Sequence, residues 1–211
     1  MIKEEIRSLI FNYLPKLDKS NKYHPRFIDA AIEQTIKELY WDIWSVSPHN
    51  LQRYTVGYGY TTAITVNLEA STQLYYSTLP AAIVPFPDKC SGVRRIHTPV
   101  QAGVKFYPMD AREHDLILNG SFVNTLTDMV GYSVNQSRVE YYNMTAAIIA
   151  SGVRMDIIQP FSAYADTDTV LLPELRDKDG GTFESRVLSK LGVIQPVNLN
   201  EDTEMITKNE G

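Results

Sequence analysis

The stretch "PRFIDAAIEQTIKELYWDIW", residues 25–44, places apolar side chains three and four positions apart. This spacing is typical of one face of an α-helix, and a proline is well tolerated in the first turn. We therefore predict a long helix over about residues 26–44. Its broad apolar stripe comprises Phe27, Ile28, Ala31, Ile32, Thr35, Ile36, Leu39, Tyr40 and Ile43. Such a stripe must be buried, either against a sheet of the same chain, which we favour, or against another subunit.

Helices are also expected on both sides of this one. Residues 2–14 carry apolar side chains at helical spacing, and Pro15 is expected to end that run. Later in the chain, "GTFESRVLSKLG" predicts a short helix that stops at Gly192, because glycine readily adopts the left-handed conformation that follows many helices. Residues 111–126 are expected to hold one more short helix.

From Leu51 onward the apolar period changes from that of a helix to that of a strand. β-branched and aromatic residues alternate with polar ones, which is typical of strands. The expected strands lie within residues 54–60, 61–69, 73–80, 91–99, 103–110, 130–134, 138–142 and 152–161. The sequence "NQS", residues 135–137, predicts a hairpin turn. The two prolines of "AAIVPFPDKCSG" exclude residues 81–92 from a central strand.

Together these elements predict an α+β fold with a mostly antiparallel β-region. We expect N-terminal helices over residues 1–50 and a β-rich region with inserted loops over residues 51–165. An acidic turn and the C-terminal helix are expected over residues 166–192, and an extended, polar tail over residues 193–211.

The charge of the chain is mildly negative, with 20 Lys and Arg against 25 Asp and Glu. Proteins that grip nucleic acid through its phosphates normally carry a basic excess, and we interpret the pair Arg94-Arg95 as two charges flanking a strand. No apolar run has the length of a bilayer span, and the acid-containing N-terminal stretch is unlike a signal peptide. The 13 tyrosines favour contact surfaces between chains, because a tyrosine ring packs while its hydroxyl stays hydrated.

The sequence lacks the familiar motifs of catalysis and cofactor binding. It contains no GxxxxGK[ST], GxGxxG, HExxH, GxSxG or CxxC pattern. Its single cysteine, Cys90, cannot form an internal disulfide and is expected to be a small, half-buried residue. We therefore expect no enzyme activity, no cofactor and no catalytic or metal-binding residue.

Two groups of polar residues are possible exceptions to this expectation. "REHD", Arg112 to Asp115, could offer a base, but its members point to different sides of a helix and a solvated helix start is the better interpretation. Asp166, Asp168 and Glu174 are residue types that bind calcium, but they lack the glycine and the closing glutamate of an EF-hand loop. We predict a turn there.

The order of these pieces resembles the head-to-tail adaptor, or neck ring, proteins of tailed bacteriophages. "HPRFIDAAIEQTIKELYWDI" resembles the family's long N-terminal helix, and "YYSTLPAAIVPFPDKCSGVRRIHTP" its strand–Leu-Pro–turn–strand unit. "KFYPMDAREHDLI" resembles its strand leading into a helix, and "VGYSVNQSRVEYYNM" its hairpin. "GVRMDIIQPFSAYADTDTVLLPE" resembles its strand, acidic turn and final Pro-containing segment. The resemblance covers about residues 25–192, and the tyrosine-rich, cysteine-poor composition is similar to that of ring proteins of crAss-like phages.

This resemblance implies a structural virion protein that forms a ring of copies of itself, commonly a dodecamer. The ring would join the portal protein to other neck or tail proteins and surround a channel that DNA crosses without sequence-specific binding. The protein would be made in the host cytoplasm, reside in the virion neck and have no membrane partner. The expected subunit or partner contacts are Phe27, Ile28, Tyr40, Trp44, Val170, Leu171, Leu172 and Pro173.

Two other classes of function stay open at this point. Another virion protein with a binding role, such as a tail or fibre-attachment module, would contact distal tail proteins in place of the portal. A small hydrolase would use His114 with Asp115 and would lose its activity in the variant His114→Ala.

Overall fold

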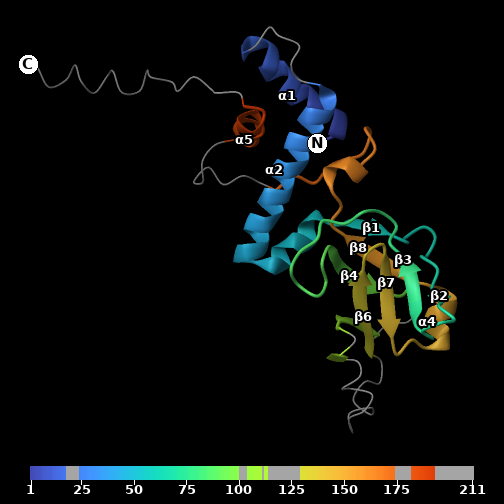
Figure 1. Ribbon diagram of the computed structural model, residues 1–211. Coiled ribbons are helices and arrows are strands. Elements are labelled where there is room, and N and C mark those ends of the chain that lie inside the picture. Colours follow the sequence, from blue (N-terminus) through green and yellow to red (C-terminus); the bar gives the residue numbers. More distant parts are fainter. Residues whose placement is uncertain (18–23, 100–103, 111, 114–128, 174–181, 193–211) are drawn as a thin grey trace, which may run out of the picture. The chain divides into compact units, whose positions relative to one another are not determined.

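The computed structural model describes residues 1–17, 24–99, 104–110, 112–113, 129–173 and 182–192 (Figure 1). The chain divides into two compact units. The first comprises Met1–Lys3 and Ile36–Pro173, and the second comprises Glu4–Thr35 and Glu174–Gly211. The combination of helices and sheets confirms the predicted α+β class.

A small antiparallel sheet of the first unit has the order β1-β8-β4. Strand β1 spans Val56–Tyr58, β8 spans Arg154–Ile157 and β4 spans Val93–His97. In the central strand β8, Met155 and Ile157 alternate with Arg154 and Asp156, and the first two are fully buried. The predicted strand within residues 152–161, with Val153, Met155 and Ile157 on one face, is therefore confirmed.

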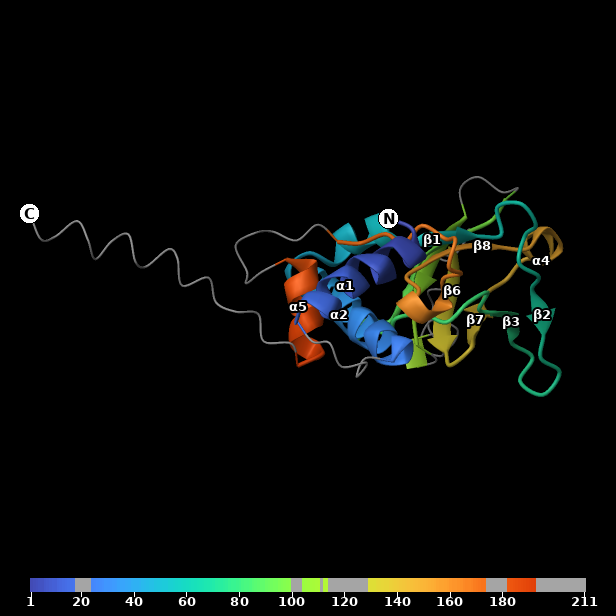
Figure 2. The same cartoon turned by 90° about the horizontal axis from the view of Figure 1, so that it is seen from above.

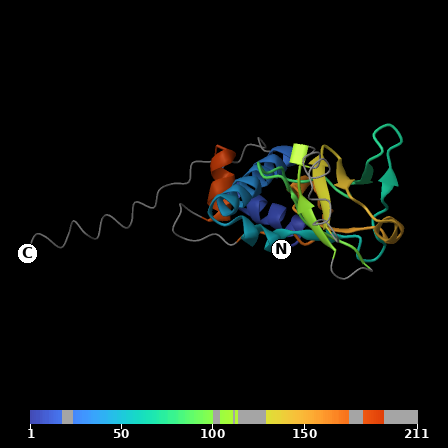
Figure 3. The same ribbon diagram turned by 90° about the horizontal axis from the view of Figure 1, so that it is seen from below.

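A larger sheet of the same unit has the order β2-β3-β7-β6-β5 (Figure 2). Its strands, seen from the opposite side in Figure 3, are β2 (Asn67–Leu68), β3 (Tyr75–Thr78), β7 (Arg138–Tyr142), β6 (Met129–Asn135) and β5 (Lys105–Pro108). The predicted hairpin is confirmed, because Asn135 pairs with Arg138 across a two-residue turn in which Gln136 has a φ of 51°. The β5–β6 pair is parallel, an exception within a mostly antiparallel region.

The hydrophobic core of the first unit draws residues from both sheets. Its fully or nearly fully buried members are Val66, Val93, Ile96, Val130, Tyr132, Val139, Tyr141, Ile148, Val153, Met155 and Ile157. Alternation along each strand leaves the opposite faces of the sheets for polar residues.

The predicted strand within residues 61–69 is interrupted. Ile64 forms an isolated antiparallel bridge with Val153, which precedes β8, whereas Asn67 and Leu68 pair with β3 in the larger sheet. An isolated bridge and a two-residue strand therefore replace one continuous strand.

Short helical segments complete the first unit. Helix α4, Ala146–Ser151, was not predicted, although its N-cap Thr145 accepts a hydrogen bond from the Ile148 amide. Two 3₁₀ segments span Pro48–Tyr54 and Phe161–Ala163. Residues 81–92, whose prolines predicted a loop or a sheet edge, form no regular helix or strand.

Three helices supply the described part of the second unit. Helix α1 spans Lys3–Leu17, α2 spans Pro25–Val46 with its first half in this unit, and α5 spans Phe183–Lys190. Arg7 of α1 holds Asp29 of α2 through Nε and Nη2, each 2.7 Å from a carboxylate oxygen. The buried apolar residues of these segments are Ile6, Ile10, Leu14, Ile28, Ala31, Ile32, Phe183, Val187 and Leu188.

The helix boundaries agree with the predictions in two cases and differ in one. Helix α2 covers the predicted residues 26–44, and Gly192 follows α5 with a φ of 72°, as expected of a residue that ends a helix. Helix α1, however, continues through Pro15 to Leu17, so the proline does not end it. The missing Pro15 amide costs the helix one hydrogen bond, to the carbonyl of residue 11, and the helix continues for only two residues beyond it.

Candidate interaction sites

The predicted contact residues of helix α2 lie in contrasting environments. Phe27 is 66% exposed, whereas Ile28 is buried. Tyr40 is buried too, and its hydroxyl donates a 2.9 Å hydrogen bond to the Leu171 carbonyl. Trp44 is half-buried and donates from Nε1 to Asp88 Oδ2 at 3.2 Å. Phe27 thus presents the most free apolar surface of these four, and a contact with another chain stays a prediction.

The predicted contact segment Val170–Pro173 is held by the first residues of the same chain. Ile2 bridges Thr169 in an antiparallel arrangement. The Lys3 amide donates to the Asp168 carbonyl at 3.0 Å, and the Val170 amide donates to the Met1 carbonyl at 2.9 Å. Val170 and Pro173 are buried, and Leu171 and Leu172 are half-buried.

The side chain of Lys3 adds further contacts between the N-terminal residues and residues 161–166. The residue is only 5% exposed, and its ammonium donates to the Tyr164 carbonyl at 2.6 Å. The same nitrogen lies 3.9 Å from an Asp166 oxygen and 5.2 Å from the centre of the Phe161 ring. A buried ammonium requires such partners, because an unpaired charge inside a protein is costly. We call Met1–Lys3 together with residues 164–170 the N-terminal clasp.

The variant Lys3→Met should lower the free energy of unfolding by about 1–3 kcal/mol. It keeps the length of the side chain but leaves the Tyr164 carbonyl without its donor, and an unsatisfied buried group costs about that much. Urea unfolding followed by circular dichroism would measure the change, with the exposed neighbour Glu4→Gln as control. Equal stability of Lys3→Met and the unaltered chain would show that the ammonium does not hold the clasp.

The acidic stretch before Val170 forms the predicted turn. The Asp168 amide donates to the Ala165 carbonyl at 3.0 Å, and Asp168 Oδ2 accepts from the Ala165 amide at 2.7 Å. The Asp168 carboxylate therefore closes its own turn. Glu174 lies outside the described residues.

An aromatic cluster surrounds Arg94, the first of the two adjacent arginines. Arg94 donates from Nη1 to Asp88 Oδ2 at 2.6 Å, and its guanidinium lies 4.7 Å from the centre of the Phe86 ring. Trp41, which is 43% exposed, packs 5.9 Å from Phe86 and 5.6 Å from Trp44, measured between ring centres. Arg94 is thus held inside its own unit. The prediction that the two arginines flank a strand is wrong, because both lie within strand β4.

Cys90 is half-buried, as the sequence predicted. Burial raises the pKa of its thiol, and a hydrogen bond with Tyr132 only partly offsets that effect. A thiol with a raised pKa is poorly ionised near neutral pH and is a weak nucleophile.

Arg95, the second adjacent arginine, lies on the outer face of the small sheet. It is exposed and stands opposite Asp156 of β8, while His97 stands opposite Arg154. The Tyr60 hydroxyl donates to Asp156 Oδ1 at 2.9 Å, and the Tyr60 ring lies 5.2 Å from the Arg154 guanidinium carbon. Burial and the nearby arginines lower the pKa of His97, so its imidazole is mainly neutral near pH 7.

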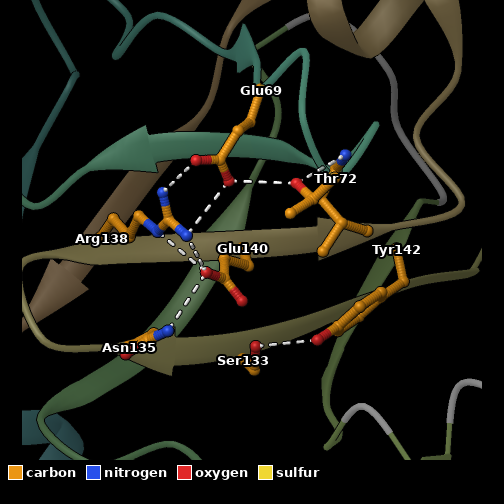
Figure 4. A network of polar contacts seen from close by, with 8 residues as sticks. Glu69, Thr72, Ser133, Asn135, Arg138, Glu140 and Tyr142 are labelled. Atoms are coloured by element: carbon orange, nitrogen blue, oxygen red, sulfur yellow. Dashed lines mark hydrogen bonds and ion pairs between the residues drawn. The ribbon is translucent and has the colours of Figure 1, made fainter.

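A polar network covers the outer face of the larger sheet (Figure 4). Arg138 donates to Glu140 Oε1 at 2.8 Å and to Glu69 Oε1 at 3.2 Å, and Asn135 donates to the same Glu140 oxygen at 3.2 Å. The hydrogen bonds from Arg138 and Thr72 hold the pKa of the Glu69 carboxyl below its usual value. These side chains satisfy one another and tie the hairpin β6–β7 to the segment after β2.

Of the short helix expected over residues 111–126, which includes the candidate hydrolase residues, the structure describes only Arg112 and Glu113. His114 and Asp115 lie outside the described residues. Glu113 accepts from the Asp110 amide at 3.1 Å, while Asp110 accepts from the Glu113 amide at 2.8 Å, which is the reciprocal pairing of a capping box. Glu113 also pairs with Lys89. Arg112 is exposed, so the described half of "REHD" fits a helix start.

Within the described ranges of the chain, no three His, Cys, Asp or Glu side chains gather into a group that could hold a metal ion. None of the helices in the same ranges combines the length and the apolar character that crossing a bilayer requires. Comparisons with family models, with curated proteins and with solved structures found no match to this chain.

Proposed function

We propose that this chain is a structural virion protein, a subunit of a ring in the neck of a tailed bacteriophage. The ring connects the portal to the tail and surrounds the channel that DNA crosses. The order of helix, strands, acidic turn and final helix supports this proposal through its resemblance to neck ring proteins. The work of such a subunit is contact with its neighbours, without a bond made or broken.

The observation that carries the proposal is the exposed aromatic surface of helix α2. Phe27 is 66% exposed in the first turn of a helix whose next residue, Ile28, is buried. Trp41, further along the same helix, is 43% exposed. Aromatic residues are enriched at the centres of protein interfaces, where they bury large areas at a small entropic cost. A closed ring needs two different contact surfaces on each subunit, and this helix is suited to supply one.

Assembly of the purified chain tests the proposal. Mass photometry, alone and in mixtures with a phage portal protein, should show a discrete closed oligomer, and electron micrographs should show rings. The variant Phe27→Asp should shift most of the protein to smaller species, because a charge at an interface core resists desolvation. Its matched control is Leu68→Asp, which alters a residue of similar exposure that is not among the predicted contacts.

Two outcomes would count against the neck ring. A chain that remains a monomer at all concentrations and with every portal protein tested would contradict it. Cross-links to distal tail proteins in place of the portal would favour a tail or fibre-attachment role.

A further inference from the structure

The outer face of the small sheet carries a compact group of cationic side chains. Arg95 stands opposite Asp156, and Arg154 stands opposite His97, two positions along the same pair of strands. Ile96 and Met155 point into the core from one face of the small sheet. Because side chains alternate along a strand, these four residues lie on its other face. Arg95 and Arg154 are therefore diagonal neighbours, about 7–8 Å apart at the backbone. We call Arg95, Arg154, His97 and Tyr60 the cationic face.

The cationic face includes the aromatic ring of Tyr60. Tyr60 is 50% exposed, and its ring covers Gly57, where an added Cβ would lie 2.6 Å from a ring carbon. Arg154 stacks on the Tyr60 ring, and the His97 ring lies 5.5 Å from it, centre to centre. Strand β1 thus contributes a glycine where another residue would force the ring to move.

The positive charges of the cationic face are not balanced by ion pairs. In the portion of the chain that the structure describes, neither Arg95 nor Arg154 forms one. The facing acid, Asp156, accepts from Tyr60 through Oδ1. Arg154 Nε and His97 Nδ1 are buried without a hydrogen-bond partner among the described residues. Arg95 is exposed and Arg154 is half-buried, so both can meet an anionic ligand at this face.

The C-terminal residues 193–211, which we call the acidic tail, carry a net negative charge that is complementary to the cationic face. Residues 193–211 contain Glu201, Asp202, Glu204 and Glu210 against the single base Lys208. Carboxylates are the preferred partners of guanidinium groups.

We propose that the cationic face docks the acidic tail of a second copy, with Asp202 and Glu204 against Arg95 and Arg154. This proposal rests on the proposed ring, since it makes the tail a strap between subunits. An acidic peptide fits better than nucleic acid, because the chain as a whole has a net charge of −5 and only two arginines compose the patch.

Peptide binding tests the face without requiring a ring. The probe is a fluorescent peptide of residues 193–211, titrated with the full chain carrying Glu201→Gln, Asp202→Asn and Glu204→Gln, so that its own tail does not compete. Saturable binding should weaken at least tenfold on adding Arg95→Glu, and at least fivefold between 50 and about 300 mM salt. The matched charge reversal at exposed Arg26, Arg26→Glu, should change the affinity by less than twofold, and Arg95→Lys should retain most of it.

Isotope mixing decides which copy supplies the tail. Arg95→Lys introduces an amine that a carbodiimide can couple to a nearby carboxylate in an equal mixture of ¹⁴N and ¹⁵N chains. We expect cross-linked peptides in which a β4 peptide of one isotope is joined to a tail peptide of the other isotope. Pairs within one isotope alone would overturn docking by a second copy, and an absence of peptide binding would overturn the tail as ligand. Binding of a DNA duplex through Arg95, with no binding of the peptide, would overturn it as well.

These results separate the two proposals. If rings form but the peptide does not bind, the docking inference fails and the neck role stands. If the peptide binds and light–heavy pairs form but no closed ring is seen, the docking inference stands and the neck role fails.

Discussion

Truncation of Ile157 to alanine should lower the free energy of unfolding by about 2–5 kcal/mol. Ile157 is fully buried at the end of β8, where it pairs with Val56 on one side and Val93 on the other. It belongs to the core that both sheets share, so its removal leaves a cavity lined by residues of several strands. Urea denaturation of Ile157→Ala, followed by circular dichroism and by tyrosine and tryptophan fluorescence, would measure the change.

The control for this truncation removes an apolar side chain that is already in water. Val46 is 82% exposed at the end of helix α2, and Val46→Ala should change stability by less than about 0.5 kcal/mol. Comparable losses in the two variants would contradict the assignment of Ile157 to the core.

Substitution of Gly152 by alanine should cost about 2–6 kcal/mol. Gly152 follows helix α4 with φ 71° and ψ −172°, a region that is essentially restricted to glycine. An added Cβ would also lie 2.7 Å from the Ile64 carbonyl oxygen and 3.0 Å from the Ala63 Cβ. Backbone strain and overpacking each cost about 1–3 kcal/mol, and here they act together.

Gly192 provides a matched control within the same chain. It follows helix α5 with a φ of 72°, but an added Cβ would have no neighbour within 4 Å. Gly192→Ala should therefore show the backbone cost alone, about 1–2 kcal/mol. Thermal unfolding of both variants tests the comparison. An equal loss in the two would mean that the contact of residue 152 with Ile64 contributes nothing.

The N-terminal clasp fixes part of the segment Val170–Pro173 within its own chain. The segment Val170–Pro173 was expected to meet another chain, and the structure shows the Val170 amide bonded to Met1 and the Leu171 carbonyl bonded to Tyr40. A segment fixed in this way presents its half-buried residues, Leu171 and Leu172, in one defined arrangement. Binding to a prearranged surface avoids much of the ordering cost of about 1–2 kcal/mol per residue.

Local patterns in the sequence predicted several elements correctly. The apolar spacing over residues 26–44 marked helix α2, Gly192 marked the end of α5, and "NQS" marked the turn between β6 and β7. Each of these signals lies within a few residues of the structure it specifies, because helix periodicity and turn conformation depend on neighbours along the chain. Helix α4 had such signals too, in Thr145 and Gly152, but six residues give too few turns for the helical period to show.

Other features were decided only by tertiary structure. Residues 61–69 have the pattern of one strand, yet Ile64 forms an isolated bridge with Val153, and only Asn67 and Leu68 join the larger sheet. Lys3 looks like an exposed helix residue in the sequence, and only Tyr164, Asp166 and Phe161, about 160 positions later, make it a buried cation. The same holds for Arg95 and Arg154, which are 59 positions apart in the sequence and become neighbours only because β4 pairs with β8. A strand pattern in the sequence indicates that a segment pairs, but it does not identify the partner strand. Because the paired residues are far apart in the chain, only the folded structure shows which segments meet.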